Sequence, residues 1–378
     1  MYDRALQALF VLALEPEFEA TFEENSYGFR PGRSQIDAMK QIQLCLQRTD
    51  RFVLDADISK CFDKINHEKL LDLIGHKGKV RTQIRAWLES GNIFEGIFES
   101  SDAGTPQGEV ISPLLSNIAL DGIEKRIGDW AETQRLLRPN GKLVDKKKDR
   151  RKSIIFVRYA DDFVVMNHNL SLIQKCKEII NEFLTERGLE LSDAKTKIVH
   201  TRMSFENNKP GFEFLGFKIK HFETKKHSAK NNQGHNIDFR LLIFPSKNSR
   251  NKHFATIDRI LRQNKTANQS QIVRKLNPII IGWTNYFRFS HLLTTKIGGY
   301  MEQILFNKLK YWGKRKLNSA NKKLKSYDKF WHKIDGRRQF AFKDRNGEYV
   351  TISLYRKVAK GVSLVKYVKV KKTIQYIS

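Results

Sequence analysis

Apolar positions recur at helical spacing in some stretches of the chain and cluster or alternate in others. Apolar residues three or four apart predict amphipathic helices, whereas short runs of β-branched and aromatic residues predict strands. On this basis RFVLDADI, residues 51–58, and the alternating GFEFLGFKIK, residues 211–220, are expected strands. Helices are expected over residues 3–14, 35–48, 67–74, 112–126 and 171–187, and the helical pattern returns from about 252 to 325.

The order of these elements indicates the fold class. Strands and helices follow one another without a regular strand-helix-strand rhythm, which favours an α+β fold with a largely antiparallel sheet. Asn, Lys, Gly and His crowd together over residues 225–250, and we place a domain boundary there. After it come the helical segments and then a tail, from about residue 340 to 378, with short β-like runs.

The net charge of the chain indicates which kinds of partner it is expected to bind. The 378-residue chain has 69 Lys and Arg against 41 Asp and Glu, a formal net charge of +28. Compact domains usually carry much less, so we infer a polyanionic partner, with nucleic acid foremost. A basic surface without a partner and an anionic membrane surface are the weaker alternatives. Taken alone, the basic segment 141–152 is interpreted as a solvated loop rather than as a phosphate contact.

Cysteine usage and hydropathy indicate in which cellular compartment the chain is expected. The three cysteines, Cys45, Cys61 and Cys176, are far apart and have neither CxxC spacing nor paired histidines nearby. They therefore predict neither a disulfide framework nor a zinc site, and they fit a reducing cytosol. No apolar run is long enough to cross a bilayer, so no membrane partner is expected.

The segment RYADDFVV, residues 158–165, predicts two strands joined by a turn that carries Asp161 and Asp162. Neighbouring carboxylates repel each other unless a cation compensates them, so a divalent metal is the first hypothesis. Asp57 ends the strand predicted at 51–58 and offers a third acid. Three carboxylates from adjacent strands can hold two Mg²⁺ ions for nucleotidyl transfer.

Other interpretations of these acids stay open. Most Asp-Asp pairs lie in surface turns, although the apolar residues on both sides of this pair argue against a surface hairpin. Asp55 is a rival acid of the same strand parity as Asp57, and Asp63 falls in the next element, where it could cap a helix.

Several segments together resemble a known family. Five occur in the order of successive polymerase palm motifs: DADISKCFDKINH (55–67), GTPQGEVISPLLSNIAL (104–120), YADD (159–162), GLELSDAKTKIVH (188–200) and FEFLGFKI (212–219). With YGFRPGRS (27–34) they resemble most closely the reverse transcriptases encoded by group II introns. NPIIIGWTNYFRFS (277–290) and YWGKRK (311–316) resemble the maturase (X, or thumb) domain of the same family.

The resemblance implies a right-hand polymerase fold with a fingers and palm region and a helical thumb. The expected domains are partial fingers over residues 1–50, a palm with finger elements over 51–225, a helical thumb/maturase (X) domain over 226–340, and a β-like tail of the maturase region over 341–378.

The resemblance also assigns roles residue by residue. It makes Asp57, Asp161 and Asp162 the metal ligands, with the backbone carbonyl of Ile58, for two Mg²⁺ ions or Mn²⁺ as the alternative. Lys195 would be the catalytic acid that protonates the departing pyrophosphate, although a solvated lysine is nearly as good an interpretation. The residues that it places at the incoming dNTP are Ile58, Phe62, Gln107, Gly108 and Tyr159. Of these, Phe62 would exclude a 2′-hydroxyl, and without the resemblance it would be a core residue.

RNA contacts are expected from basic side chains in two regions. Arg30 and Arg33 lie in the finger-like loop and would bind template phosphates or pair with local acids. In the helical part, aromatic and cationic residues interleave, which suits base stacking and phosphate contact. The candidates there are Arg288, Lys314, Arg315 and Lys316, on the exterior of a thumb core.

The resemblance predicts an RNA-directed DNA polymerase, a nucleotidyltransferase that extends a DNA primer with dNTPs on an RNA template. It also predicts a maturase that binds group II intron RNA in splicing and mobility. The alternatives are a fragment with weak or no polymerase activity that serves as an RNA-binding splicing cofactor, and a domesticated or CRISPR-associated reverse transcriptase. Oligomeric state and DNA target stay undetermined.

Two departures from the family pattern bear on activity. The chain begins at MYDRALQALF, a sequence that lies within the fingers of related proteins, so we expect earlier finger motifs to be absent and dNTP use to be weakened. Glu109 stands where the family usually has a glycine. No His-Asn-His endonuclease cluster follows, and cleavage of target DNA by this chain is not expected.

Overall fold

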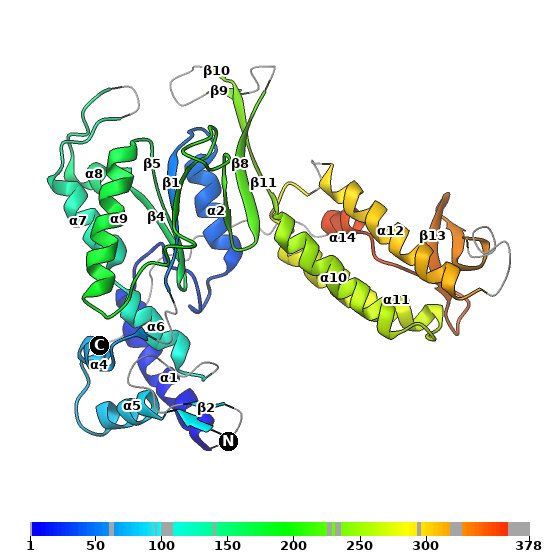
Figure 1. Ribbon diagram of the computed structural model, residues 1–378, viewed down its shortest axis with the longest axis horizontal. Coiled ribbons are helices and arrows are strands. Elements are labelled where there is room, and N and C mark those ends of the chain that lie inside the picture. The colour runs from blue at the N-terminus through cyan, green and yellow to red at the C-terminus, as the bar shows by residue number, and fades with distance from the viewer. Residues whose placement is uncertain are drawn as a thin grey trace. The chain divides into compact units, whose positions relative to one another are not determined.

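The computed structural model describes most of the chain and divides it into two compact units (Figure 1). The described residues are 2–59, 64–90, 92–94, 97–99, 109–138, 141–224, 229–230, 236–292, 296–317 and 327–361. Among them, the first unit holds the residues up to 215 and from 220 to 241, and the second holds 216–219 and the residues from 242 onward.

The first unit contains eight of the described helices, and their starts follow from local sequence. They are α1 (Tyr2–Thr21), α2 (Gln35–Leu46), α4 (His67–Ile74), α5 (Lys79–Glu89), α6 (Ser112–Leu120), α7 (Ile123–Thr133), α8 (Lys147–Ser153) and α9 (Leu170–Thr185). At the start of α2, the Asp37 carboxylate accepts a hydrogen bond from the Ser34 backbone N–H at 2.7 Å. At the start of α4, the Asn66 side chain accepts from the Lys69 N–H. Both contacts satisfy backbone donors that a helix N-terminus leaves free.

A four-stranded antiparallel sheet lies at the centre of the first unit, and it confirms the expected α+β class. Its strands, in spatial order, are β4 (Ile155–Tyr159), β5 (Asp162–Asn167), β1 (Phe52–Asp57) and β6 (Lys197–His200). The register sets Asp57 opposite Asp162 and Leu54 opposite Val165. Because side chains alternate along a strand, the two members of each pair face the same side of the sheet.

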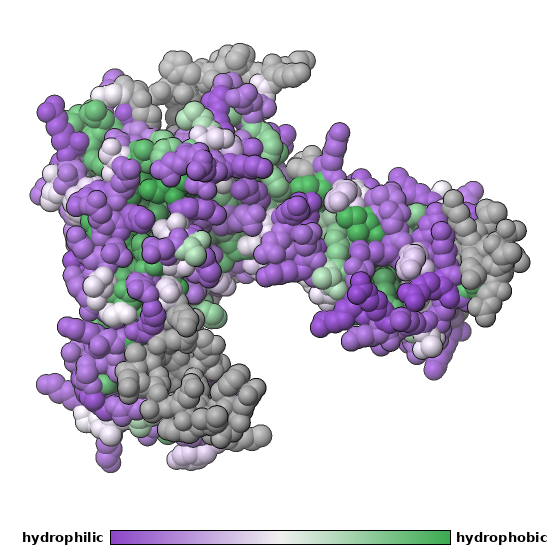
Figure 2. All heavy atoms as spheres, viewed as in Figure 1, coloured by the Kyte–Doolittle hydropathy of each residue, from purple (hydrophilic) through white to green (hydrophobic). Residues whose placement is uncertain are grey.

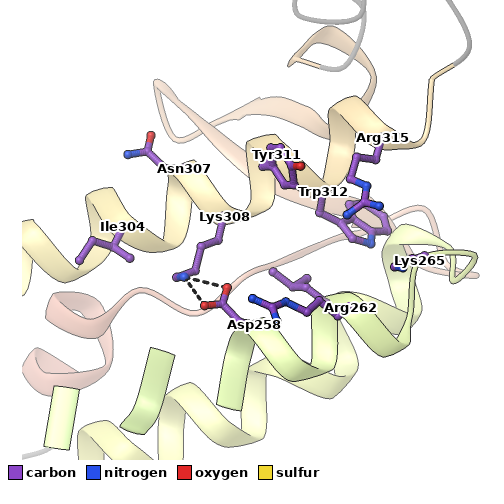
Figure 3. A pocket seen from close by; sticks show the side chains of 10 residues that line it. Asp258, Arg262, Lys265, Ile304, Asn307, Lys308, Tyr311, Trp312 and Arg315 are labelled. Atoms are coloured by element: carbon purple, nitrogen blue, oxygen red, sulfur yellow. Dashed lines mark hydrogen bonds and ion pairs between the residues drawn. The ribbon is translucent and has the colours of Figure 1, made fainter. Parts of the chain in front are cut away.

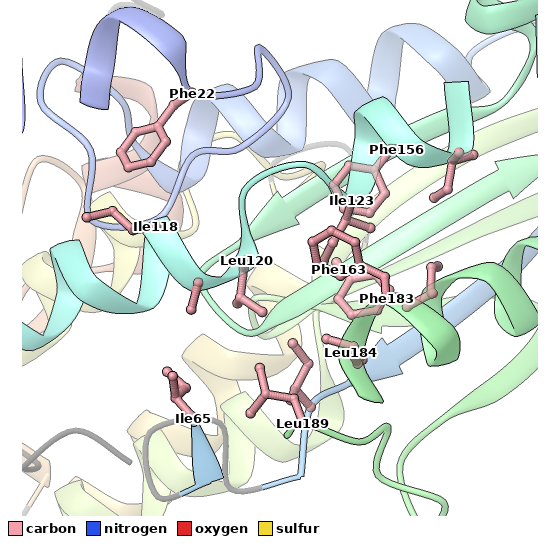
Figure 4. Packing of buried hydrophobic residues seen from close by; sticks show 14 of the residues in the cluster. Phe22, Ile65, Ile118, Leu120, Ile123, Phe156, Phe163, Phe183, Leu184 and Leu189 are labelled. Atoms are coloured by element: carbon pink, nitrogen blue, oxygen red, sulfur yellow. The ribbon is translucent and has the colours of Figure 1, made fainter. Parts of the chain in front are cut away.

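Helices cover the two faces of this sheet. Helix α9 packs on β1 and β5, α2 packs on β4, and Figure 1 shows α9 and α2 on opposite sides of the sheet. The main core gathers on the α9 side, where Phe156, Phe163 and Phe183 meet Ile123 and Leu184 (Figure 4). Burial of several large apolar side chains, at about 1.5–3 kcal/mol each, makes this layer the main stabiliser of the unit.

Smaller sheets accompany the central one. A three-stranded sheet has the order β11 (Phe239–Pro245), β8 (Phe217–Glu223) and β7 (Phe212–Phe214). Two short strand pairs complete the set: β2 (Asn92–Phe94) with β3 (Ile97–Glu99), and β9 (Ala229–Lys230) with β10 (Asn236–Ile237). Strands β8 and β11 are each divided between the two units.

The second unit is built from helices and a small antiparallel sheet. Its helices are α10 (Lys247–Gln263), α11 (Gln269–Tyr286), α12 (Ile297–Arg315) and α14 (Tyr355–Gly361), and its sheet comprises β12 (Trp331–Ile334), β13 (Arg337–Lys343) and β14 (Tyr349–Thr351). Aromatic residues dominate its core. Trp331 and Phe340 meet edge to face with ring centroids 5.0 Å apart, and the two rings of Trp312 and Phe330 lie 5.5 Å apart.

Four local expectations are corrected by the structure. The helix expected over 112–126 is two helices, α6 and α7, because Gly122 has φ +101° and turns the chain between them. The single strand expected over 211–220 is two strands, β7 and β8, joined at Leu215 and Gly216. The basic segment expected to be a loop ends in helix α8, and the tail expected to be β-like contains helix α14.

The surface seen in Figure 2 is hydrophilic over most of each unit. Within the described part of the chain, no helix combines the length and the apolar character needed to cross a membrane.

Candidate active site

Three acids converge where β1 and β5 end. Asp57 is the last residue of β1 and lies directly opposite Asp162, the first residue of β5. Asp161 precedes Asp162 in the turn from β4, and in that turn Ala160 adopts φ +57°. A non-glycine residue in this left-handed region costs about 1 kcal/mol, and such strain is found preferentially at functional sites.

Two lysines lie against the acids of β1. The Nζ atom of Lys195 is 2.6 Å from Oδ2 of Asp57, and Nζ of Lys197 is 3.2 Å from Oδ2 of Asp55. Asp55 faces the same side of the sheet as Asp57, as its strand parity predicts, and is nearly buried at 8% exposure. The Asp55 carboxylate is thus part of the acidic cluster, with a lysine of β6 as its salt-bridge partner.

Burial and neighbouring charges shift the pKa values of Asp161 and Asp162, and Asp57 shifts that of Lys195. Burial, followed by the charges of Asp55, Asp57 and Asp161, raises the pKa of Asp162 to about 7. Burial, followed by the charge of Asp57, also raises the pKa of Asp161. The hydrogen bond and charge of Asp57 raise the pKa of Lys195. Negative charge is therefore crowded here beyond what the protein itself neutralises, and an added cation would relieve it.

The donor set fits a hard divalent cation, because carboxylate oxygens are the ligands that Mg²⁺ prefers. Among the residues that the structure describes, no three His, Cys, Asp or Glu side chains are already grouped closely enough to form a metal cage. The cation beside Asp57 is the Lys195 ammonium, whose side chain is 69% exposed. Ion binding would accordingly require Lys195 to swing away from Asp57, which its exposed position permits.

The turn that carries Asp161 rests on a segment more than a hundred residues earlier in the chain. The Tyr27 N–H donates to the Arg158 carbonyl and the Arg158 N–H donates to the Asn25 carbonyl, both at 2.9 Å. A Cβ atom placed on Gly28 would lie 2.3 Å from the backbone nitrogen of Ala160. Only a glycine lets the backbone approach the turn so closely.

Arg158 anchors the turn from inside the protein. Its side chain is fully buried, and Nη1 donates to Asn117 Oδ1 at 3.1 Å and to the Ala160 carbonyl at 3.3 Å. Asn117 in turn donates to the Gly28 carbonyl at 2.9 Å. Our sequence reasoning missed this network. Strand parity was the available signal, because it places Arg158 on the inward face beside Phe156.

A second strained turn contacts the site at Asp162. Leu215 and Gly216 link β7 to β8 with φ values of +49° and +77°. The Leu215 backbone hydrogen-bonds the Asp162 carboxylate and lowers its pKa, against the larger effect of burial. The left-handed Leu215 thus aims a backbone donor at the most strongly perturbed acid of the site.

The other residues predicted for catalysis and dNTP binding are placed as follows. Ile58 is buried and forms an isolated bridge with Leu191, directly after Asp57. Tyr159 pairs with Asp162 in the ladder between β4 and β5. Phe62, Gln107 and Gly108 lie outside the described residues.

Arg30 and Arg33 contact a local acid and backbone carbonyls of the finger-like loop, which is one of the two alternatives expected for them. The Arg30 guanidinium is buried, ion-paired with Glu19 at 2.5 Å, and donates to the Glu23 and Ser26 carbonyls. Arg33 donates to the Ser26 carbonyl and lies 3.8 Å from the Glu19 carboxylate. These contacts hold the loop together, as the alternative of pairing with local acids stated, and they do not support a template contact by Arg30.

The basic residues predicted in the second unit lie at its surface or partly buried. Arg288 follows α11, and Arg315 ends α12. The Arg315 guanidinium is 5.7 Å from the Tyr311 ring centroid, and Lys316 Nζ is 5.6 Å from that of Trp312. Cationic and aromatic groups are therefore interleaved here, as the sequence predicts.

Glu109, which departs from the family pattern, has a specific partner. Its carboxylate accepts a hydrogen bond of 2.6 Å from Gln7 Nε2, and the Gln7 side-chain oxygen accepts from the Val110 N–H at 3.0 Å. Gln7 lies in α1 and is 1% exposed. Glu109 and Val110 thus tie the residues directly before α6 to α1.

An antiparallel sheet that presents facing acids at its strand ends, with a further acid in the adjoining turn, defines the palm of a nucleic-acid polymerase. The chain belongs to the reverse transcriptase family: residues 1–219 match the family described as reverse transcriptase (RNA-dependent DNA polymerase). Residues 250–331 match the family described as group II intron, maturase-specific domain. The predicted resemblance is confirmed.

Relatives of this chain come from bacteria and from a eukaryote. Protein YkfC of Escherichia coli K12 is 29% identical over 57% of this chain and 60% of its own length. The group II intron-encoded protein LtrA of Lactococcus lactis is 29% identical over 58% of this chain and 43% of its own. Maturase-like protein 1 of Euglena gracilis is 25% identical over 77% of this chain and 53% of its own. The chain thus spans 60% or less of the length of these curated relatives.

Among solved structures, an apo telomerase from Candida tropicalis overlaps 57% of this chain and 43% of its own, at 15% identity and a TM-score of 0.39. That overlap is too weak to carry an argument.

Proposed function

We propose that this chain is an RNA-directed DNA polymerase that extends a DNA primer with dNTPs on an RNA template, and that it also binds group II intron RNA as a maturase. The observation that carries the polymerase proposal is the pairing of Asp57 with Asp162 across adjacent strands, with Asp161 in the turn. The crowding that raises the pKa of Asp162 supports it, because such a cluster is suited to a cation.

The proposed metal ligands are Asp57, Asp161 and Asp162 with the Ile58 carbonyl, and the proposed ions are two Mg²⁺, with Mn²⁺ as the alternative. When bound, such ions stabilise charge on the triphosphate and lower the pKa of the attacking 3′-hydroxyl. The protein's share is to hold the carboxylates in place, and the strained turns at Ala160 and Leu215 serve that purpose.

Lys195 is the proposed proton donor to the departing pyrophosphate. Its ammonium reaches Asp57 from the segment before β6, so it lies beside the proposed metal ligands. The interaction with Asp57 raises its pKa, which keeps it protonated until that contact is broken. Phe62, Gln107, Gly108 and Tyr159 remain the proposed dNTP contacts.

A second candidate function is RNA binding without polymerisation, as a splicing cofactor. The match of residues 250–331 to a maturase-specific domain and the basic, aromatic surface of α12 favour it.

The compartment that we propose is reducing, either bacterial or organellar, and Cys45 and Cys176 are free thiols in the structure.

Primer extension tests the polymerase proposal. The chain is incubated with an RNA template, a DNA primer, dNTPs and Mg²⁺, and compared with Asp161→Asn and with Asp145→Asn, an exposed acid of the loop before α8. We expect Asp161→Asn to lower the rate by about 10³-fold, because it removes electrostatic stabilisation at the reacting centre, and Asp145→Asn to leave it unchanged. Equal extension by all three proteins would contradict the assignment of Asp161. RNA binding without extension by any of them would favour the splicing cofactor.

A further inference from the structure

The second unit contains a pocket between α10 and α12 that the polymerase chemistry does not use. Its volume is about 580 Å³, within the range of small-ligand sites. The lining residues repeat every three or four positions on each helix, so one face of α10 and one face of α12 form its walls (Figure 3).

The floor of the pocket is apolar and fixed. Leu261 and Trp312 are 8% and 4% exposed and line it together with Ile304. The indole N–H of Trp312 donates to the Asn264 carbonyl at 3.2 Å, which sets the orientation of the ring. Tyr311 lies beside this floor and is 64% exposed, so much of its side chain is accessible to a ligand from solvent.

The rim of the pocket is cationic. Arg262, Lys265, Lys308 and Arg315 line it against one acid, Asp258, which leaves a net charge of +3. Asp258 is already paired, at 2.6 Å, with Lys308 (Figure 3). Among the described residues, no carboxylate lies within ion-pair distance of the other three cations, so their charge is available to an anion from outside.

We infer that this pocket binds one unpaired nucleotide of an RNA chain, with the base against Tyr311 and the apolar floor and the phosphates on the cationic rim. A base within a duplex is covered on both faces by its neighbours and cannot enter, whereas an unpaired base has a free face for stacking on an aromatic ring. A surface that contacted only duplex phosphates would need the cations but neither the cavity nor the exposed Tyr311. This inference rests on the proposed RNA binding and specifies its ligand.

Two RNA hairpins with the same stem test the inference, one fully paired and one with a single bulged 2-aminopurine nucleotide. Binding to the full chain is measured by fluorescence anisotropy, and stacking by quenching of the 2-aminopurine. We expect the chain to bind the bulged RNA about tenfold more tightly and to quench its fluorescence. Tyr311→Ala should abolish this preference and leave the Kd for the paired RNA within about twofold, and Tyr311→Phe should retain the preference.

Tyr300 provides the matched control, because it lies on the same helix, is 58% exposed and does not line the pocket. Tyr300→Ala should change neither affinity. Equal affinity of the unaltered chain for the two RNAs, or equal effects of Tyr300→Ala and Tyr311→Ala, would overturn the inference while leaving RNA binding intact. Loss of the preference in the presence of adenosine monophosphate would support the inference, because a free nucleotide offers the same base and phosphate to the pocket. Failure of the chain to bind either RNA would refute the proposed function itself.

Discussion

Replacing Gly28 with alanine tests whether the loop before α2 positions the catalytic turn. The new Cβ would lie 2.3 Å from the Ala160 nitrogen and 2.9 Å from the Tyr159 carbonyl carbon. Both neighbours are backbone atoms, so no side chain can rotate out of the way. Ordinary contact begins at about 3.4 Å, and the turn must therefore move by about 1 Å.

Two effects of different size are expected from this displacement. Overpacking of this kind costs about 1–3 kcal/mol of stability, which leaves a protein of ordinary stability mostly folded at 25 °C. A displacement of about 1 Å at the reacting centre costs about 10²-fold in rate. Gly28→Ala should therefore lose far more activity than its folded fraction accounts for.

The assay is single-nucleotide extension of a primer at saturating dNTP, with thermal unfolding measured on the same preparation. Gly282→Ala in α11 is the control, because a Cβ there meets nothing within 4 Å. Full activity of Gly28→Ala at an unchanged melting temperature would refute the close approach. A fall in activity that matches the folded fraction would show that Gly28 matters for packing alone.

Two further substitutions test contacts described above. Glu109→Gly should leave the buried Gln7 amide without its partner and lower stability by about 1–2 kcal/mol, whereas Glu109→Gln should keep the contact; equal melting temperatures for the two variants would refute the role of the pair. Burial raises the pKa of Glu23 to about 7, so protonation of this carboxyl group favours the native state. This contribution to the free energy of unfolding is fully present below the unfolded-state pKa near 4.5 and is lost as the pH rises through 7. Glu23→Gln should therefore remove about 3 kcal/mol of the decline in unfolding free energy between pH 5 and 8, and parallel pH profiles in urea titrations would contradict this.

Local pattern predicted three strands of the central sheet, β1, β4 and β5, but neither β6 nor the side-chain contacts between segments far apart in the chain. The strands at 51–58 and 158–165 are short β-rich runs, and the ordered motifs identify Asp57, Asp161 and Asp162 together. The break at Gly122 escaped prediction because a glycine within a helical pattern does not by itself reveal a left-handed conformation.

The loop arginines and the pocket show the same limit. The choice between a template contact and pairing with a local acid stayed open for Arg30, because nothing in the loop sequence shows that Glu19, on the preceding helix, folds back against it. The pocket brings together residues 258–265 and 304–315, which neither composition nor spacing links. Such features depend on how whole elements pack, and periodicity does not encode that.

The central position of β1 also governs the order in which this protein can fold. Phe52 pairs with Asn167 on one side and His200 on the other, 115 and 148 residues further along the chain. Such non-local pairing is slow, because the entropy of closing a long loop is lost before any contact offsets it. A chain emerging from the ribosome therefore exposes both edges of β1 until β5 and β6 have been synthesised. During that interval the apolar strand is a site for aggregation, and a folding chaperone would act there.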